Sequence, residues 1–423
     1  MIAVRVVALS IDARTPKPAR NVQFPPPPPG GGGTTPSSPA VAPNCPWISS
    51  GLGDARLLPP AGRRLGGFSL DWMVDTPTSV AGRVGFVPSV NGAFVHITTN
   101  TTFEKSMIAW YADQVRLAGK SQGQVATLSI ALMSDLELSG VADALWDEVA
   151  DEMRRVNYEV GVPIFLRFAH EMNGNWLPYG QRPIAFQRAW RRLTSAVRQR
   201  TNLTAMVWAP NMGAGYPFST TQYSPANGTD EFKALDTNGD GELTNKDDPY
   251  LPFWPGRDWV DWVGISIYWF GPGDTPSNTL PPTDYIFTIA HGNSSFNAAN
   301  TTFDFYAKYA LNESRPMMLP ESGALFYYAD PKGVKVDAGV GELAMKREFW
   351  TQAWAAKGSL AGMNMVRAVL HFEEAKLESR GNGTFRVTSD PTIRAAFLAD
   401  VAEDLKRGPA GLTYYCNGTV GSV

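Results

Sequence analysis

Eight short apolar segments, separated by stretches with helical periodicity, constrain the fold of this chain more than any other feature of its sequence. Near-continuous apolar runs are typical of parallel strands that are buried on both faces. Strands that alternate with helices form βαβ units, and eight such units favour a closed (β/α)8 (TIM) barrel over an open doubly wound sheet. The predicted strands are Leu65–Asp71, Ala93–Ile97, Ala126–Met133, Pro163–Ala169, Thr204–Ala209, Trp259–Tyr268, Pro316–Pro320 and Met365–His371.

Amphipathic patterns between these segments indicate the helices of the barrel. Leu145–Val156 and Phe186–Val197 each repeat apolar residues on one helical face. We expect a last helix over Ile393–Leu405, with Asp390 as its N-cap and Gly408 at its end. The chain has no glycine-rich dinucleotide fingerprint or phosphate loop, which further weakens the open-sheet alternative.

The composition argues against several classes of partner. Of the 423 residues, 43% are hydrophobic, which is enough for a large core. The net charge is −3, the sequence pI is about 5.9, and no run is rich in Lys and Arg. This balance argues against nucleic acid or an anionic membrane as the main partner. No apolar run reaches the roughly 18 residues of a transmembrane helix. We expect a monomer that uses no organic cofactor.

The chain is predicted to have three parts. Residues 25–44 are rich in Pro, Gly, Ser and Thr, a composition that cannot build a core and marks a linker. Residues 1–24 make a poor signal peptide, because Arg5 interrupts the apolar stretch and Asp12 follows closely. We therefore expect that this start is incomplete or misassigned. Residues 45–423 form the predicted barrel domain.

Two other features indicate a secreted, extracellular protein. The two cysteines, Cys45 and Cys416, stand at the two ends of the predicted barrel, whose termini lie close together. A disulfide between them would contribute several kcal/mol, and the alternative is two unrelated thiols. Eight glycosylation sequons each predict an exposed asparagine if they are used. They begin at Asn100, Asn202, Asn227, Asn293, Asn300, Asn312, Asn382 and Asn417.

The segment PIFLRFAHEMNGNWLPYG, residues 163–180, is the most informative about chemistry. A buried strand ends abruptly in polar residues, and in a barrel such residues face the active site. Arg167 and His170 could hold the carboxyl group of Glu171 and tune its pKa, so that it donates a proton near neutral pH. The alternative for the His170–Glu171 pair alone is a helix cap or a solvated loop.

A second acid, Glu321, follows another short apolar strand in the string PMMLPESGA, residues 316–324. Glu171 and Glu321 belong to the fourth and seventh predicted strands, so both would project to the same face of a barrel. Retaining glycosidases need two carboxyl groups about 5–5.5 Å apart, one as nucleophile and one as acid/base. The two acids are candidates for such a pair.

Together, the strings RFAHEMNGNW, DWVGISIYW and LPESGA resemble glycoside hydrolase family 26 over roughly residues 60–410. The resemblance implies a retaining endo-β-1,4-mannanase, or a relative that cleaves β-1,3-1,4-glucan or β-1,3-xylan. It implies Glu171 as acid/base with His170 beside it, Glu321 as nucleophile, Tyr268 as the tyrosine that hydrogen-bonds the nucleophile, and Trp176 as an aromatic residue of the cleft.

One departure from the family pattern bears on the substrate. Mannanases of this family commonly have further aromatic residues just after the tryptophan that corresponds to Trp176, whereas this chain continues with Leu177–Gly180. The polysaccharide therefore stays open. Further candidates for substrate contact rest on position alone, with core or loop packing as an equal alternative: Asn173, Trp208, Asn211, Trp269 and His96.

Between the fifth and sixth predicted strands, DTNGDGELTNKDD fits the pattern of an EF-hand calcium loop. Asp236, Asn238 and Asp240 occupy positions 1, 3 and 5, and Glu242 offers its backbone carbonyl at position 7. Asp247 stands at position 12, where glutamate is usual. We predict a structural Ca²⁺ site in this insertion, with an acidic turn without metal as the alternative.

Two non-catalytic functions compete with the hydrolase hypothesis. A carbohydrate-binding barrel that has lost catalysis would lack one of the two acids, and both are present. A calcium-binding extracellular interaction protein would use the insertion instead. Metal-dependent hydrolysis has little support, because the chain has four His and no HExxH motif, and Ser/His/Asp catalysis lacks a GxSxG elbow.

Overall fold

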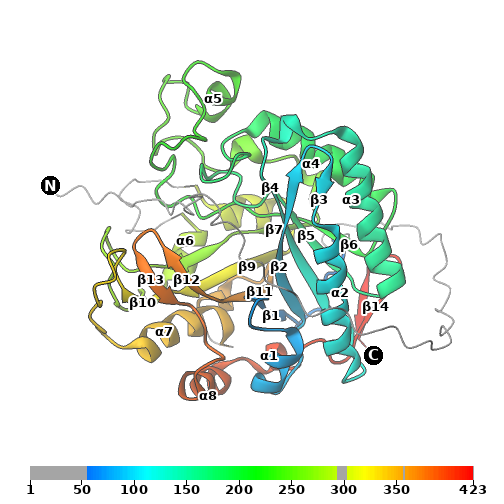
Figure 1. Ribbon diagram of the computed structural model, residues 1–423, viewed down its shortest axis with the longest axis vertical. Helices are drawn as coiled ribbons and strands as arrows, with labels where there is room; N and C mark the ends of the chain where they lie inside the picture. The colour runs from blue at the N-terminus through cyan, green and yellow to red at the C-terminus, as the bar shows by residue number, and fades with distance from the viewer. Residues whose placement is uncertain (1–54, 293–302, 356–357, 423) are drawn as a thin grey trace.

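A closed ring of eight parallel strands forms the centre of the molecule (Figure 1). The computed structural model describes residues 55–292, 303–355 and 358–422. The ring closes because β1 pairs in parallel with both β2 and β11. Its strands are β1 (Leu65–Leu70), β2 (Val90–Thr99), β4 (Thr127–Ser134), β5 (Ile164–Phe168), β6 (Thr204–Trp208), β7 (Trp262–Gly264), β9 (Met317–Ala324) and β11 (Val366–Glu373). The predicted (β/α)8 barrel and its eight strands are confirmed.

The sixth predicted strand is shorter than expected. Trp259 belongs to a short 3₁₀ turn, Arg257–Trp259, and the rest of the segment divides into β7 and β8 (Ile267–Trp269). β7 pairs with β6 and with the start of β9, whereas β8 pairs with the later part of β9. The apolar run is therefore continuous in sequence, but the strand is interrupted between Gly264 and Ile267.

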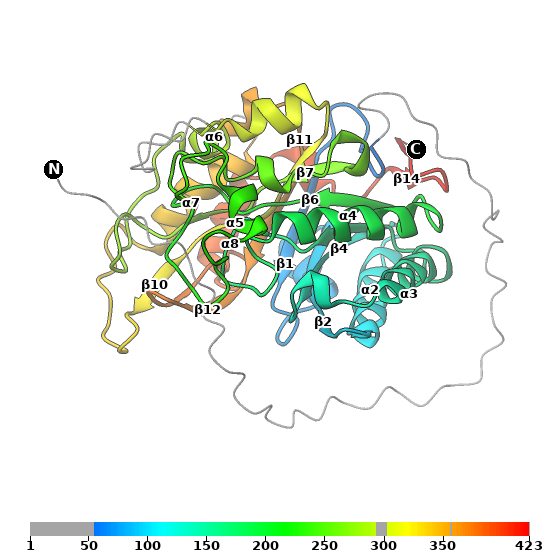
Figure 2. The ribbon, with the colours of Figure 1, turned by 90° about the horizontal axis from the view of Figure 1, so that it is seen from above.

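Helices surround the ring, and in Figure 2 α2, α3 and α4 lie together on one side while α6 and α7 lie on another. The helices are α1 (Pro77–Val84), α2 (Lys105–Lys120), α3 (Asp143–Arg155), α4 (Pro183–Arg198), α5 (Asp230–Leu235), α6 (Tyr285–Ala290), α7 (Glu342–Trp354), α8 (Pro391–Asp400) and α9 (Glu403–Lys406). Asp390 caps α8 as predicted, by accepting from the amides of Thr392 and Ile393. The predicted last helix is interrupted, since α8 ends at Asp400 and Gly408 follows α9 instead.

Strand alternation along β6 sends its side chains into two different core clusters. Ala205, Val207 and Ala209 pack with residues of neighbouring strands in one cluster, and Trp208 packs in a second cluster with residues of the surrounding helices. Successive side chains of a strand point to opposite faces, so Trp208 points outward between the strands and the helices. There its indole lies against Trp254, Phe305 and Tyr309.

Several short strands accompany the ring. The two-residue β3 (Thr102–Phe103) pairs with β2. A small antiparallel sheet contains β10 (Phe326–Ala329), β13 (Gly381–Thr384) and β12 (Ala375–Glu378), in that order. β14 (Leu412–Tyr414) and β15 (Val420–Ser422) form a hairpin. The insertion between β6 and β7 carries α5 and projects from the body of the molecule in Figure 1.

The features that suggested secretion fall partly within the described residues. Cys45, Asn293 and Asn300 lie outside them, so the Cys45–Cys416 disulfide stays a prediction. Of the other sequons, those at Asn100, Asn227, Asn312 and Asn382 are exposed, and those at Asn202 and Asn417 are half-buried. Among the described residues, none of the helices combines the length and the apolar composition that a membrane crossing needs.

Truncation of Trp208 tests its position in the core. The side chain is 0% exposed, so we expect Trp208→Ala to lower the free energy of unfolding by about 3–5 kcal/mol. Thermal and urea unfolding would measure the change. Trp110→Ala, on a helix residue that is 39% exposed, is the matched control and should lower the free energy of unfolding clearly less. Equal stability of Trp208→Ala and the wild type would contradict this packing.

Candidate active site

Glu171 stands in a tight turn directly after β5. Both Ala169 and Glu171 have left-handed backbone conformations, with φ of 46° and 55°. Such a conformation costs a non-glycine residue about 1–3 kcal/mol, so it persists only where the surroundings hold it. Here the Glu171 amide donates to the Ala209 carbonyl at 2.8 Å, and the side chain of Met172 is fully buried. The turn thereby fixes the Glu171 side chain over the end of the barrel.

A β-bulge in β9 presents the second acid. The three-residue step from Leu319 to Ser322 lies opposite a two-residue step from Val369 to His371 in β11. Pro320 lies in this step and has no amide hydrogen to give to the ladder, which accounts for the interruption there. Bulges next to active sites commonly re-aim a side chain. Glu321 lies within this bulge, and its side chain lines the pocket.

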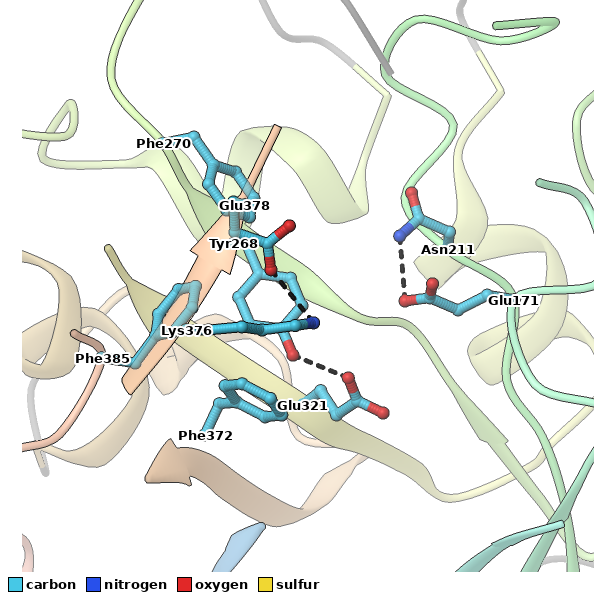
Figure 3. Close-up of a pocket in the computed structure, with 9 residues that line it drawn as sticks. All are labelled: Glu171, Asn211, Tyr268, Phe270, Glu321, Phe372, Lys376, Glu378 and Phe385. Carbon is cyan, nitrogen blue, oxygen red and sulfur yellow. Dashed lines mark hydrogen bonds and ion pairs between the residues drawn. The ribbon is translucent and has the colours of Figure 1, made fainter. Parts of the chain in front are cut away.

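Two groups hold the Glu321 carboxylate, which is 5% exposed. Arg167 Nη2 donates to Oε1 at 2.7 Å. The hydroxyl group of Tyr268 donates to Oε2 at 2.6 Å, a bond that Figure 3 shows. The Nε2 atom of His170 lies 3.8 Å from Oε1, which is beyond hydrogen-bond range. The structure thus brings the two predicted acids together with Arg167, His170 and Tyr268. Arg167, which the sequence analysis assigns to Glu171, donates to Glu321 instead.

Asparagine side chains hold Glu171 differently. Asn211 Nδ2 donates to Glu171 Oε1 at 2.9 Å. Asn173 fixes Asn211 in turn, because its amide group donates to the Asn211 carbonyl and accepts from the Asn211 backbone amide. Glu171 therefore has a neutral partner, whereas Glu321 has a cationic one.

The surroundings drive the pKa values of the two acids apart. Burial, followed by the nearby charge of Glu321, raises the pKa of Glu171 to about 7. Burial also acts to raise the pKa of Glu321, but the Arg167 charge and the Tyr268 hydrogen bond outweigh it and leave that pKa below its ordinary value. Burial and Arg167 lower the pKa of His170 to about 3, so its imidazole is neutral near pH 7. Two carboxyl groups with opposite shifts are suited to one acid and one nucleophile.

Both acids line one pocket, which is open to solvent. Asn211 and Tyr268 line it as well. Sequence reasoning missed its other residues, namely Phe270, Phe372, Lys376, Glu378 and Phe385. A partial signal existed, since the string ESRGNGT after β11 contains turn residues that are typical of a hairpin.

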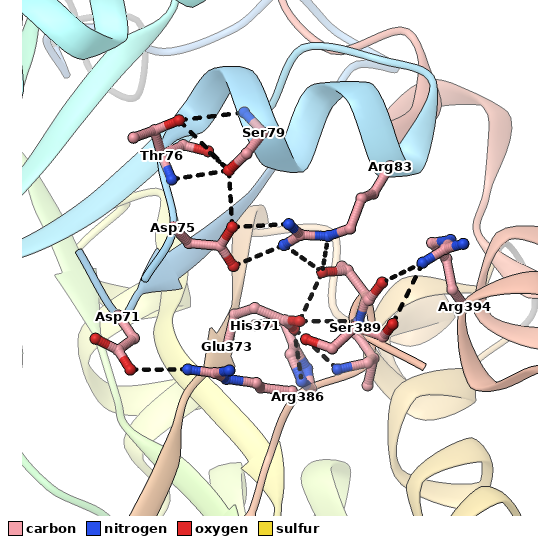
Figure 4. Close-up of polar contacts among 12 residues, drawn as sticks. Asp71, Asp75, Thr76, Ser79, Arg83, His371, Glu373, Arg386, Ser389 and Arg394 are labelled. Atoms are coloured by element: carbon pink, nitrogen blue, oxygen red, sulfur yellow. Dashed lines mark hydrogen bonds and ion pairs between the residues drawn. The ribbon is translucent and has the colours of Figure 1, made fainter. Parts of the chain in front are cut away.

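A polar network fixes the segment that follows β13 (Figure 4). The buried Glu373 carboxylate accepts from the amides of Val387 and Thr388 and from the Thr388 hydroxyl. Arg386 pairs with Asp71, the residue after β1, at 2.8 Å. Both ends of the β12–β13 hairpin are therefore tied to the barrel.

The remaining aromatic candidates do not line this pocket. Trp208 lies in the core, and Trp269 is 3% exposed and donates to the Thr279 carbonyl. For both, the structure agrees with the packing alternative. Alternation turns Trp269 to the face opposite Tyr268, which lines the pocket, and turns Trp208 to the face opposite Val207 and Ala209. Trp176 is 4% exposed and packs on Phe218. His96 lies at the end of β2, where its Nδ1 atom contacts Asp135 at 2.7 Å.

In the calcium-loop candidate, the carboxylates take backbone partners. Asp236 accepts from the amides of Gly239, Asp240 and Gly241. Asp247 accepts from those of Thr237, Asn238 and Thr244. No group of three or more His, Cys, Asp or Glu side chains comes together as a metal site in the described part of the chain. Calcium binding through Asp236, Asn238, Asp240, Glu242 and Asp247 stays a prediction.

Comparison with known proteins gives one family match. The glycosyl hydrolase family 26 model matches residues 131–281, a range that includes Glu171 and Tyr268 and ends before Glu321. This confirms the resemblance seen in the sequence. No curated protein sequence matches the chain.

Several solved structures resemble the chain at low identity. A modular endo-β-1,4-mannanase from Cellulomonas fimi is 16% identical with a TM-score of 0.51, over 88% of this chain and 76% of that one. An engineered protein is 15% identical with a TM-score of 0.50, over 87% and 74%. A β-mannanase of this family from Bacteroides ovatus is 14% identical with a TM-score of 0.49, over 84% and 92%. The first two likenesses support the fold.

The opposite pKa shifts predict a bell-shaped pH dependence of kcat/KM for glycoside hydrolysis. Activity should fall as the pH rises through about 7, where Glu171 loses its proton, and as it falls through the lowered pKa of Glu321. Arg167→Met should move the acidic limb to higher pH, because it removes the charge that lowers the pKa of Glu321. Arg116→Met, on the outside of α2, is the control. An acidic limb that does not move in Arg167→Met would contradict this assignment.

Proposed function

We propose that this chain, a glycoside hydrolase that matches family 26 through residues 131–281, is a retaining endo-β-glycanase with Glu171 as acid/base and Glu321 as nucleophile. One observation carries the proposal. Two buried carboxyl groups from β5 and β9 share a pocket, and their surroundings shift their pKa values in opposite directions.

The two environments suit the two steps of double displacement. In the first step Glu321 attacks the anomeric carbon while Glu171 donates a proton to the leaving oxygen. Glu171 has that proton to give, because its pKa lies near 7. The bond to the leaving group breaks, and a glycosyl ester forms on Glu321.

In the second step Glu171, now ionised, takes a proton from water, and the water oxygen attacks the anomeric carbon. The Glu321 ester bond breaks and the carboxylate leaves. Arg167 and Tyr268 stabilise that carboxylate through the hydrogen bonds at 2.7 Å and 2.6 Å. The product retains the anomeric configuration of the substrate, and both acids return to their starting protonation states.

β-1,4-Mannan is the substrate we propose first. The mannanases among the structural neighbours motivate this choice, and the family match agrees with a polysaccharide substrate. Mixed-linkage β-1,3-1,4-glucan and β-1,3-xylan are the alternatives, because the Leu177–Gly180 run after Trp176 departs from the usual mannanase pattern. Initial rates on galactomannan, glucomannan, barley β-glucan and β-1,3-xylan would rank them.

We also propose an extracellular location and a monomeric state. The exposed sequons at Asn100, Asn227, Asn312 and Asn382 are accessible to glycosylation, and a Cys45–Cys416 disulfide would form in the same oxidising compartment. A structural Ca²⁺ in the insertion would fit this setting.

A non-catalytic carbohydrate-binding barrel is the second candidate. The presence of both acids argues against this function. Binding alone does not require a Glu171 carboxyl group with a raised pKa beside the buried Glu321 carboxylate. Binding of the polysaccharides without turnover would favour it.

Removal of the acid/base should affect the two steps unequally. We expect Glu171→Ala to lower kcat on polysaccharide by about 10²–10⁴-fold, because the leaving oxygen then departs without a proton. An aryl glycoside with a good leaving group should lose far less, and azide should restore turnover and yield a glycosyl azide of retained configuration.

Glu148→Ala, on an exposed glutamate of α3, is the matched control and should behave as the wild type. Equal losses of Glu171→Ala on both substrates, without azide rescue, would contradict the acid/base role.

A further inference from the structure

We propose that Lys376 and Glu378 form a sugar-binding pair on the nucleophile's side of the cleaved bond and select a neutral sugar there. The inference rests on the proposed function, because it takes Glu321 as the nucleophile. It concerns two residues of the β12–β13 hairpin that lie outside the catalytic chemistry.

Alternation along β12 sends these two side chains into the pocket. Ala375 and Leu377 are exposed, and Leu377 reaches 68%. Lys376 and Glu378 have the opposite orientation, as residues two apart in a strand share a face. Both line the pocket that contains the catalytic acids. An ion pair without a role in the pocket could equally stand on the solvent face of β12, with Ala375 and Leu377.

The hairpin is held firmly enough to keep them there. β13 pairs with β12 on one side and with β10 on the other. In the turn, the buried Arg380 donates to the carbonyls of Phe270 and Gly271 at 3.4 Å. A Cβ at Gly383 would lie 2.4 Å from the Phe326 carbonyl oxygen, so the close approach of β10 requires glycine there. These contacts hold the hairpin, and with it Lys376 and Glu378, in place.

Figure 3 shows on which side of the reaction the pair lies. Lys376 and Glu378 stand with Tyr268 and Glu321, whereas Glu171 and Asn211 face them from the other side of the pocket. In double displacement the nucleophile contacts the anomeric carbon of the glycone, and the acid/base contacts the leaving group. The hairpin pair therefore faces the glycone sugar, the one that becomes attached to the enzyme.

The chemistry of the pair suits sugar hydroxyl groups. Lys376 Nζ donates to Glu378 Oε1 at 3.0 Å and lies 5.6 Å from the centre of the Phe372 ring. An ammonium group has three donors, so hydrogens remain for a ligand, and 33% of the Lys376 side chain is still accessible. Glu378 can accept from a neighbouring hydroxyl. A donor and an acceptor side by side match a pair of adjacent hydroxyl groups.

The surrounding charges favour a neutral sugar over a uronic acid. Burial acts to lower the pKa of Lys376, but the carboxylates of Glu378, Glu374 and Glu321 outweigh it and raise that pKa. The ammonium group is already paired with the Glu378 carboxylate at 3.0 Å. A sugar carboxylate in this position would lie beside that carboxylate as well as beside the ammonium group, whereas a hydroxyl group carries no charge for Glu378 to repel.

Kinetics of Lys376→Met test the contact. On mannohexaose and cellohexaose, whichever the wild type cleaves, we expect kcat/KM to fall about 10-fold to 100-fold, as for the loss of a charged hydrogen bond. Lys376→Arg should recover part of the lost kcat/KM. The thermal midpoint of Lys376→Met should stay within error of that of the wild type. Lys332→Met, an exposed lysine near β10, and Leu377→Ala, on the same hairpin, are controls and should match the wild type. Wild-type kinetics in Lys376→Met would overturn the proposal.

Calorimetry in a Glu171→Ala background separates binding from turnover. The hexaoses should bind to the Glu171→Ala protein, and the additional Lys376→Met change should lower their affinity about 10-fold to 100-fold. An oligomannuronate of equal length should bind more weakly than mannohexaose. Unchanged affinity in Lys376→Met, tighter binding of the oligomannuronate, or no oligosaccharide binding at all would each overturn the inference.

The two experiments distinguish failure of this inference from failure of the proposed function. If the wild type cleaves no glycan but Lys376→Met still weakens binding, the hydrolase proposal fails and the sugar-binding pair stands. If the wild type is active and Lys376→Met changes neither rate nor affinity, the sugar-binding pair fails and the hydrolase proposal stands.

Discussion

Closure of the parallel sheet is the constraint on which the rest of this structure depends. β1 pairs with β2 on one edge and with β11 on the other, so every strand of the ring points the same way. The carboxyl ends of all eight strands then meet at one mouth. Glu171 and Glu321 are 150 positions apart in sequence, yet their strands bring them into one pocket. The hairpin that carries Lys376 follows β11 and joins them at the same mouth.

Within that mouth, the partner of each carboxyl group shifts its pKa. A buried carboxylate needs a cation or several donors, and Glu321 has Arg167 and Tyr268. Glu171 has the neutral amide of Asn211, so burial dominates and its proton is kept to about pH 7. The same barrel thus shifts the pKa values of two residues of one type in opposite directions, which suits the proposed acid and nucleophile. Loss of Arg167 would disturb both acids, because the charge of Glu321 also raises the pKa of Glu171.

Local pattern predicts some of this arrangement, and non-local contacts determine the rest. The eight strands follow from apolar runs, and the acids follow from polar residues that end such runs abruptly. Trp208 and Trp269 could not be assigned from position, because one step of alternation decides between pocket and core. The β9 bulge at Pro320 depends on the registers of β7, β8 and β11. The sequence pattern does not place Lys376 and Glu378 in the pocket, because their position depends on the pairing of β13 with β10, in which Phe326 lies opposite Thr384.

A trapped intermediate tests the central claim, that Glu321 is the nucleophile of a retaining pair, most directly. The protein would be incubated with 2-deoxy-2-fluoro-β-mannosyl and 2-deoxy-2-fluoro-β-glucosyl fluorides, and its intact mass and peptides would be measured. The account predicts stoichiometric addition of one fluorosugar with one of these reagents, located on Glu321 and absent from Glu321→Gln. A label on any other residue, or an active enzyme that gives product of inverted configuration, would contradict it.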